Sequence, residues 1–228
     1  MGENISTIPI NDIFEPKSGC PFCRAYSVLE QRSIEYILGG AMMQPEIRIK
    51  TNETGFCKTH YKKMLSTGNR LQNALLLQSH LKYISENIFS DGKNGKKIEK
   101  QALLSLRRLN GSCYVCDRIN LSMIHFMKTT IDMWQKDENF KRLFSQQEYF
   151  CMPHYEMLIE TVYKSGITKK EKASFCNEIA RLCNKYIETK RKDIDDFCAM
   201  FDYRNSGNVM ASPDCVEKCT ELLCGDKD

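Results

Sequence analysis

The chain has 228 residues, which is long enough to bury a sizeable core in one large domain or two small ones. Hydrophobic residues make up 42% and charged residues 27%, the mix of a soluble globular protein. A formal net charge of +4 is too small to indicate a nucleic-acid-binding protein without a localised basic patch. No uninterrupted apolar run approaches a membrane span, and the N-terminus lacks the pattern of a secretory signal. We therefore expect a cytoplasmic protein with no membrane association.

The first half of the chain is predicted to be helical. Apolar residues recur at helical spacing after Cys23, and Gly39-Gly40 is a typical helix end. A polar stretch follows at 44–55, and its last four residues are typical of a turn. From Tyr61 to Ile88 the apolar positions keep a spacing of three and four, which predicts one long helix with a broad buried face.

Beyond the first half, residues 90–97 are rich in glycine and lysine and predict a flexible linker. The elements that follow are expected in this order: a short helix at 103–109, a helix up to Trp134, a polar stretch at 135–148, a helix from Tyr155 to Ser165, a helix that begins with a capping box at 168–171, and a short helix between Pro213 and Gly225. No strand pattern of period two persists, so we predict an all-α protein.

Two short motifs each occur twice. Residues 55–61 (GFCKTHY) nearly coincide with residues 149–155 (YFCMPHY), and a Cys-x-x-Cys pair precedes each copy, at 20–23 and 113–116. In the first copy 33 residues lie between Cys23 and Cys57, and in the second copy 34 residues lie between Cys116 and Cys151. Such a near-constant spacing indicates an internal duplication.

The duplication predicts two related helical halves, each with a Cys3His metal site at helix N-termini. We expect the following division of the chain: a first helical metal-binding repeat at 1–90, a linker and short helix at 91–112, a second metal-binding repeat with a long C-terminal helix at 113–205, and a cysteine-rich tail at 206–228.

Twelve cysteines in a cytoplasmic protein point to metal or redox chemistry, because a reducing compartment disfavours structural disulfides. Three thiolates and one imidazole are ligands that zinc prefers, and four protein ligands leave no position for a substrate. We therefore expect two structural zinc ions, with an iron–sulfur cluster as the alternative. The sequence leaves pairing between the halves open, and the first interpretation assigns Cys20, Cys23, Cys57 and His60 to one ion and Cys113, Cys116, Cys151 and His154 to the other.

The remaining cysteines have no histidine beside them. Three of them share the helix predicted after the capping box and are expected to be buried thiols: Cys176, Cys183 and Cys198. Three others lie in the tail, where the sequence leaves a third metal site open: Cys215, Cys219 and Cys224.

Three segments, CPFCR (20–24), GAMMQPEIR (40–48) and TGFCKTHYKKMLSTGNRLQNALLLQSHL (54–81), resemble a family of bacterial domains of unknown function found mainly in anaerobic Gram-positive bacteria. The likeness covers about residues 8 to 165, is strongest in the first half, and leaves the tail after Asn205 outside the pattern. The resemblance implies that the cysteine–histidine motifs are a family feature, and it implies no activity.

We expect the protein to act as a binding or scaffolding module whose helical surface recognises a partner protein. An iron–sulfur or thiol redox protein is the second hypothesis. The third is a regulator that binds nucleic acid through its basic linker, although acidic residues are interleaved with the basic ones. An enzyme is not expected, because the strong ligand candidates are used in closed sites and no phosphate loop or nucleophile elbow occurs.

Overall fold

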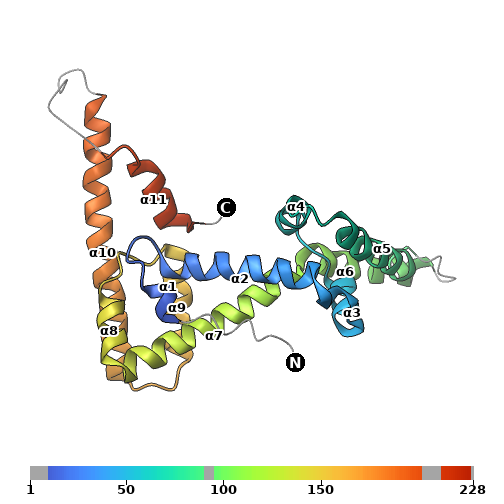
Figure 1. Cartoon of the computed structure of the whole chain (residues 1–228), viewed down its shortest axis with the longest axis horizontal. Helices are drawn as coiled ribbons and strands as arrows, with labels where there is room; N and C mark the ends of the chain where they lie inside the picture. The colour runs from blue at the N-terminus through green and yellow to red at the C-terminus, as the bar shows by residue number, and fades with distance from the viewer. Residues whose placement is uncertain (1–9, 90–94, 202–211, 227–228) are drawn as a thin grey trace. The chain divides into compact units, whose positions relative to one another are not determined.

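The computed structural model describes residues 10–89, 95–201 and 212–226. Within these ranges the chain forms eleven α-helices, one 3-10 helix and no strand, so the all-α prediction is confirmed (Figure 1). The elements in chain order are α1 (Ile10–Phe14), α2 (Pro21–Leu38), η1 (Gly40–Met43), α3 (Pro45–Thr54), α4 (Lys58–Ser66), α5 (Arg70–Asn87), α6 (Gly95–Gly111), α7 (Tyr114–Lys136), α8 (Glu138–Ser145), α9 (Met152–Lys164), α10 (Lys169–Met200) and α11 (Cys215–Cys224).

Several elements differ from the sequence-based expectation. The long helix expected at 61–88 is two helices, α4 and α5, because the chain turns at Gly68, whose φ of 78° suits glycine. The polar stretch at 44–55 is the helix α3, which begins with a proline at its first position. The polar stretch at 135–148 contains α8, whose N-cap Asp137 accepts hydrogen bonds from two backbone amides.

Other predicted boundaries are confirmed. The side chains of Thr168 and Glu171 form the reciprocal capping box that begins α10, and Gly225 ends α11 with a φ of 80°. Residues 90–94 of the predicted linker lie outside the described residues, whereas 95–97 belong to α6. None of the described helices combines the length and the apolar character needed to cross a membrane.

The chain packs as two compact units. Of the described residues, those before position 28 and after position 122 form the first unit, and those from 28 to 122 form the second. The limits of the units fall inside α2 and α7, so each unit combines parts of both sequence copies. The division expected at 1–90 and 113–205 follows the sequence repeat instead, and the structural relatedness of those two halves stays a prediction.

Aromatic side chains build the core of the first unit. Phe144 is fully buried, and its ring centroid lies 5.8 Å from that of Phe14 and 5.1 Å from that of Phe150. Phe22 lies between Cys20 and Cys23 in the sequence, and its ring centroid is 6.0 Å from that of His154. Because each aromatic ring removes a large apolar area from water, this core stabilises the surroundings of the first predicted motif.

Polar contacts hold α5 within the second unit. Only Asn73, Leu76 and His80 of this helix are buried, so the broad buried face expected there is wrong. The Asn73 side-chain amide donates to the carbonyl of Met64 at 3.0 Å and joins α5 to α4. His80 donates through Nδ1 to the carbonyl of Asn52 at 2.9 Å and joins α5 to the end of α3.

Candidate metal centres

The first cluster brings together Cys20, Cys23, Cys151 and His154, all of them buried in the first unit. Nδ1 of His154 is 3.0 Å from Sγ of Cys151, 3.5 Å from Sγ of Cys23 and 3.6 Å from Sγ of Cys20. The sulfurs of Cys23 and Cys151 are 3.6 Å apart. Four candidate ligand atoms therefore surround one point in the interior.

The second cluster brings together Cys57, His60, Cys113 and Cys116, all in the second unit. Nδ1 of His60 is 3.2 Å from Sγ of Cys57, 3.2 Å from Sγ of Cys113 and 3.4 Å from Sγ of Cys116. The sulfurs of Cys57 and Cys116 are 4.0 Å apart. These two cysteines are half-buried, whereas Cys113 and His60 are buried.

The pairing of motifs within each half that we expected is wrong. All eight predicted residues lie in the two clusters, but each cluster takes its Cys-x-x-Cys pair from one sequence copy and its Cys-x-x-His pair from the other. The structure instead pairs motifs from different sequence copies, which is the alternative that the sequence left open.

Hydrogen bonds between the loops that precede the ligands explain this pairing in the first cluster. The amide of Gly19 donates to the Glu148 carboxylate at 2.9 Å, and the amide of Glu148 donates to the carbonyl of Lys17 at 3.2 Å. The chain that leads into Cys20 is thereby held against the chain that leads into Cys151.

The second cluster is held in the same way. The Ser112 hydroxyl donates to the carbonyl of Thr54 at 2.8 Å, and the amide of Tyr114 donates to the carbonyl of Gly55 at 3.0 Å. Gly55 has a φ of 61°, and a Cβ at this position would lie 3.1 Å from Nε2 of His80. Only glycine therefore fits this turn, which directs Cys57 towards the cysteines of the other copy.

Each of the four ligand pairs, two Cys-x-x-Cys and two Cys-x-x-His, begins a helix, as predicted. Cys20 and Cys113 directly precede α2 and α7, and Cys57 and Cys151 are the N-caps of α4 and α9. Neither N-cap cysteine uses its side chain to cap the helix. The positive ends of the helix dipoles therefore face the sulfurs, which favours the thiolate form that binds metals.

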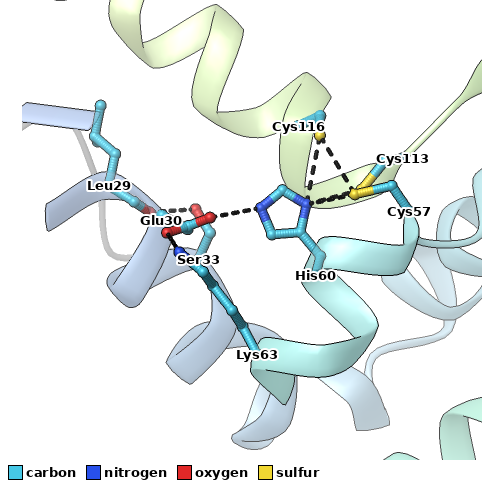
Figure 2. A network of polar contacts seen from close by, with 8 residues as sticks. All are labelled: Leu29, Glu30, Ser33, Cys57, His60, Lys63, Cys113 and Cys116. Atoms are coloured by element: carbon cyan, nitrogen blue, oxygen red, sulfur yellow. Dashed lines mark hydrogen bonds and ion pairs between the residues drawn. The ribbon is translucent and has the colours of Figure 1, made fainter. Parts of the chain in front are cut away.

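Glu30 and Lys63 orient the histidine of the second cluster (Figure 2). The Glu30 carboxylate is 3.0 Å from Nε2 of His60 and 2.7 Å from Nζ of Lys63. Burial lowers the pKa of His60, so the ring is neutral near pH 7. Because the Glu30 carboxylate accepts a hydrogen bond, the single proton of the ring lies on Nε2. The lone pair of Nδ1 then points at the three sulfurs, the arrangement found where carboxylates support metal-binding histidines.

Burial affects the thiols in the opposite sense, since it disfavours the charged thiolate. It raises the pKa of Cys20 in the first cluster and the pKa values of Cys113 and Cys116 in the second. An ion that binds these sulfurs must displace their protons, so the affinity for the ion is expected to fall as the pH falls.

A positive side chain, Arg24, lies beside the first cluster. Its guanidinium donates to the carbonyls of Ile13 at 2.9 Å and Pro16 at 2.6 Å, and it interacts electrostatically with Cys20 and Cys23. Three thiolates and one divalent cation carry a net charge of about −1. Arg24 shapes the loop that ends at Cys20, and it would compensate this charge if the cluster held such an ion.

The ligand atoms fit a tetrahedral zinc ion. With Zn–S bonds of about 2.3 Å and Zn–N bonds of about 2.0 Å, tetrahedral geometry places two sulfurs about 3.8 Å apart and a sulfur and a nitrogen about 3.5 Å apart. The recorded distances in the two clusters run from 3.0 to 4.0 Å, and all the ligand atoms of each cluster lie within 4.8 Å of one another.

The other cysteines lie outside both clusters, and the described residues contain no third group of metal ligands. Cys183 is buried as predicted and Cys176 is half-buried. Cys198 is exposed, which contradicts the expectation of a buried thiol, because no residue of α10 after Lys190 is buried. In the tail, Cys215 is buried, Cys219 half-buried and Cys224 exposed.

The chain belongs to a family described as Family of unknown function (DUF6062), whose model matches residues 1–228. This match confirms the resemblance inferred from the motifs and extends it over the tail after Asn205. No curated protein and no solved structure matches the chain.

Replacing Glu30 by Gln removes the carboxylate that orients His60. We expect the affinity of the second cluster for zinc to fall roughly 10- to 100-fold, the effect typical of losing such a supporting group. Competition with a coloured chelator measures this affinity. Glu35→Gln, on the exposed side of the same helix α2, is the matched control, and equal affinities in the two variants would contradict the role of Glu30.

Separate fragments 1–92 and 93–228 each contain one Cys-x-x-Cys and one Cys-x-x-His motif. Each cluster needs one motif from each fragment. We therefore expect that neither fragment alone binds zinc as a monomer. A mixture of the two fragments should form a heterodimer with two zinc ions. Size-exclusion chromatography with elemental analysis distinguishes these species. A monomeric fragment that holds one zinc ion as tightly as the whole chain would support pairing within each half.

Proposed function

We propose that the protein is a metal-binding helical scaffold in which each cluster holds one structural zinc ion. The observation that carries this proposal is the convergence of three sulfurs and one imidazole nitrogen within 4.8 Å in both clusters. Cysteine and histidine side chains in this proportion form zinc sites in many small helical and loop-rich modules. The orientation of His60 by Glu30 gives the second cluster the additional support typical of a metal site.

The spacing of the ligands favours a single ion over an iron–sulfur cluster. An iron–sulfur cluster contains at least two iron atoms, so ligands on different iron atoms are several bonds apart, whereas all four ligand atoms of each group here lie within 4.8 Å of one another. In the first cluster the sulfurs of Cys23 and Cys151 are only 3.6 Å apart, the separation of two ligands on one ion.

The closed ligand sets favour a structural purpose. Four protein ligands satisfy tetrahedral zinc and leave no position for water or a substrate, so the ion would stabilise the fold and take no part in catalysis. Zinc binding in small modules contributes about 10–16 kcal/mol, which is comparable with the total stability of a domain. Each ion would link two helices that are far apart in the sequence.

We also propose that the second unit binds a partner protein. Large apolar side chains are exposed along α5, where Leu71 is 68% and Leu81 is 61% accessible. Exposed apolar side chains that gather into one patch mark protein–protein contact sites, and we propose this role for α5. A cytoplasmic location is part of the same proposal, because the clusters need reduced cysteines.

Elemental analysis of protein purified without oxygen tests the proposal. We expect two zinc ions per chain, and one zinc ion per chain after Cys57→Ser, because only the second cluster loses a ligand. Cys198→Ser is the control, since this exposed residue lies outside both clusters and its loss should leave two ions. A brown protein that contains iron would favour the redox alternative, and a wild-type protein without stoichiometric metal would contradict the proposal.

A further inference from the structure

The two clusters differ in how solvent reaches their sulfurs. All four residues of the first cluster are buried, whereas Cys57 and Cys116 of the second are half-buried. The cysteines of the first cluster are therefore enclosed, whereas two cysteines of the second cluster are partly open to solvent. Access matters because a sulfur reacts with an oxidant only where the oxidant can approach its lone pairs.

The C-terminal residues supply the protection of the first cluster. The amide of Asp226 donates to Sγ of Cys23 at 3.3 Å. A Cβ on Gly225 would lie 3.4 Å from Sγ of Cys151 and 3.5 Å from Sγ of Cys23, so the backbone rests directly on both sulfurs. Cys215 and Leu222 of α11 are buried and anchor this segment.

The accessible sulfurs of the second cluster are also close to each other. Sγ of Cys57 and Sγ of Cys116 are 4.0 Å apart, and a disulfide requires about 2.05 Å. Cys57 is the N-cap of α4 and Cys116 lies in the first turn of α7, so a movement of about 2 Å at two helix ends brings the sulfurs together. The third sulfur, of Cys113, is buried.

We propose that the second cluster is an oxidation site at which a hydroperoxide converts Cys57 and Cys116 into a disulfide and zinc is released. This inference rests on the proposed zinc binding. One thiolate attacks a peroxide oxygen, forms a sulfenic acid and expels hydroxide or alkoxide; the second thiolate attacks that sulfur, forms the disulfide and expels hydroxide. The two thiolates lose two electrons and the peroxide gains them; two protons from the buffer convert the expelled anions into two water molecules, or into one water and one alcohol when the oxidant is an alkyl hydroperoxide.

Loss of two ligands explains the release of the ion. Only Cys113 and His60 remain, and two ligands do not satisfy the tetrahedral preference of zinc. The disulfide joins the starts of α4 and α7, and cellular thiols reverse it by exchange, so the ion can bind again. The first cluster would lose its ion more slowly and would hold the first unit folded in the meantime.

The test uses the zinc-loaded full-length chain and begins with its zinc content, so that a failure of zinc binding is detected before oxidation. Hydrogen peroxide is then added, released zinc is followed with a coloured chelator, and the thiols are alkylated and mapped by mass spectrometry after trypsin digestion. We expect the first of two ions to be released about 10-fold faster than the second, a ratio that corresponds to about 1.4 kcal/mol in barrier height. The matching product is a disulfide between peptides 51–58 and 109–118, at Cys57 and Cys116.

Three results would overturn the inference in a protein that holds two zinc ions: equal release rates, earlier oxidation of the first cluster, or a disulfide that uses Cys113. The protection of the first cluster has its own pair of variants. Asp226→Pro removes the amide that donates to Cys23 and should accelerate the slow release about 5-fold, the ratio expected for one net hydrogen bond. Asp226→Ala keeps that amide and should leave the slow rate of zinc release unchanged. Equal slow rates in the two variants would show that the Asp226 amide does not protect the first cluster.

Discussion

The fold depends on the gathering of three sulfurs and one imidazole around a single point, twice in the chain. Each gathering joins segments that are far apart in sequence: Cys23 and Cys151 are separated by 128 positions, and Cys57 and Cys116 by 59. Thiols buried this closely have little reason to meet without an ion, because burial raises their pKa values and thiol hydrogen bonds are weak. The proposed coordination of a metal ion at two pairs of helix N-termini would supply that reason.

Chain entropy does not decide which motifs pair. The cost of closing a loop rises only with the logarithm of its length, so closing about 128 residues in place of about 34 costs roughly 1 kcal/mol more. A zinc site contributes about ten times as much, so the directions of the helices and the contacts of the loops decide the pairing. Gly19 with Glu148 and Gly55 with Tyr114 are those contacts, and they join one copy to the other in both clusters.

The residues of the clusters could be predicted from the sequence because the ligand types and their short spacings are local features. The all-α class and the start of α10 were predictable for the same reason, since periodicity and the Thr168–Glu171 capping box act over a few residues. The pairing was not predictable, because in the second cluster it depends on the turn at Gly55, where a positive φ and the nearby ring of His80 favour glycine. Glu30 and Asp226 were missed because their contacts with His60 and Cys23 span 30 and 203 positions.

An anomalous difference map at the zinc absorption edge, from crystals of the full-length protein, tests the central claim most directly. The account predicts two peaks, one about 2.3 Å from the sulfurs of Cys20, Cys23 and Cys151 and the other equally close to the sulfurs of Cys57, Cys113 and Cys116. A peak bound jointly by Cys23 and Cys57, or a map without peaks at these cysteines, would contradict it.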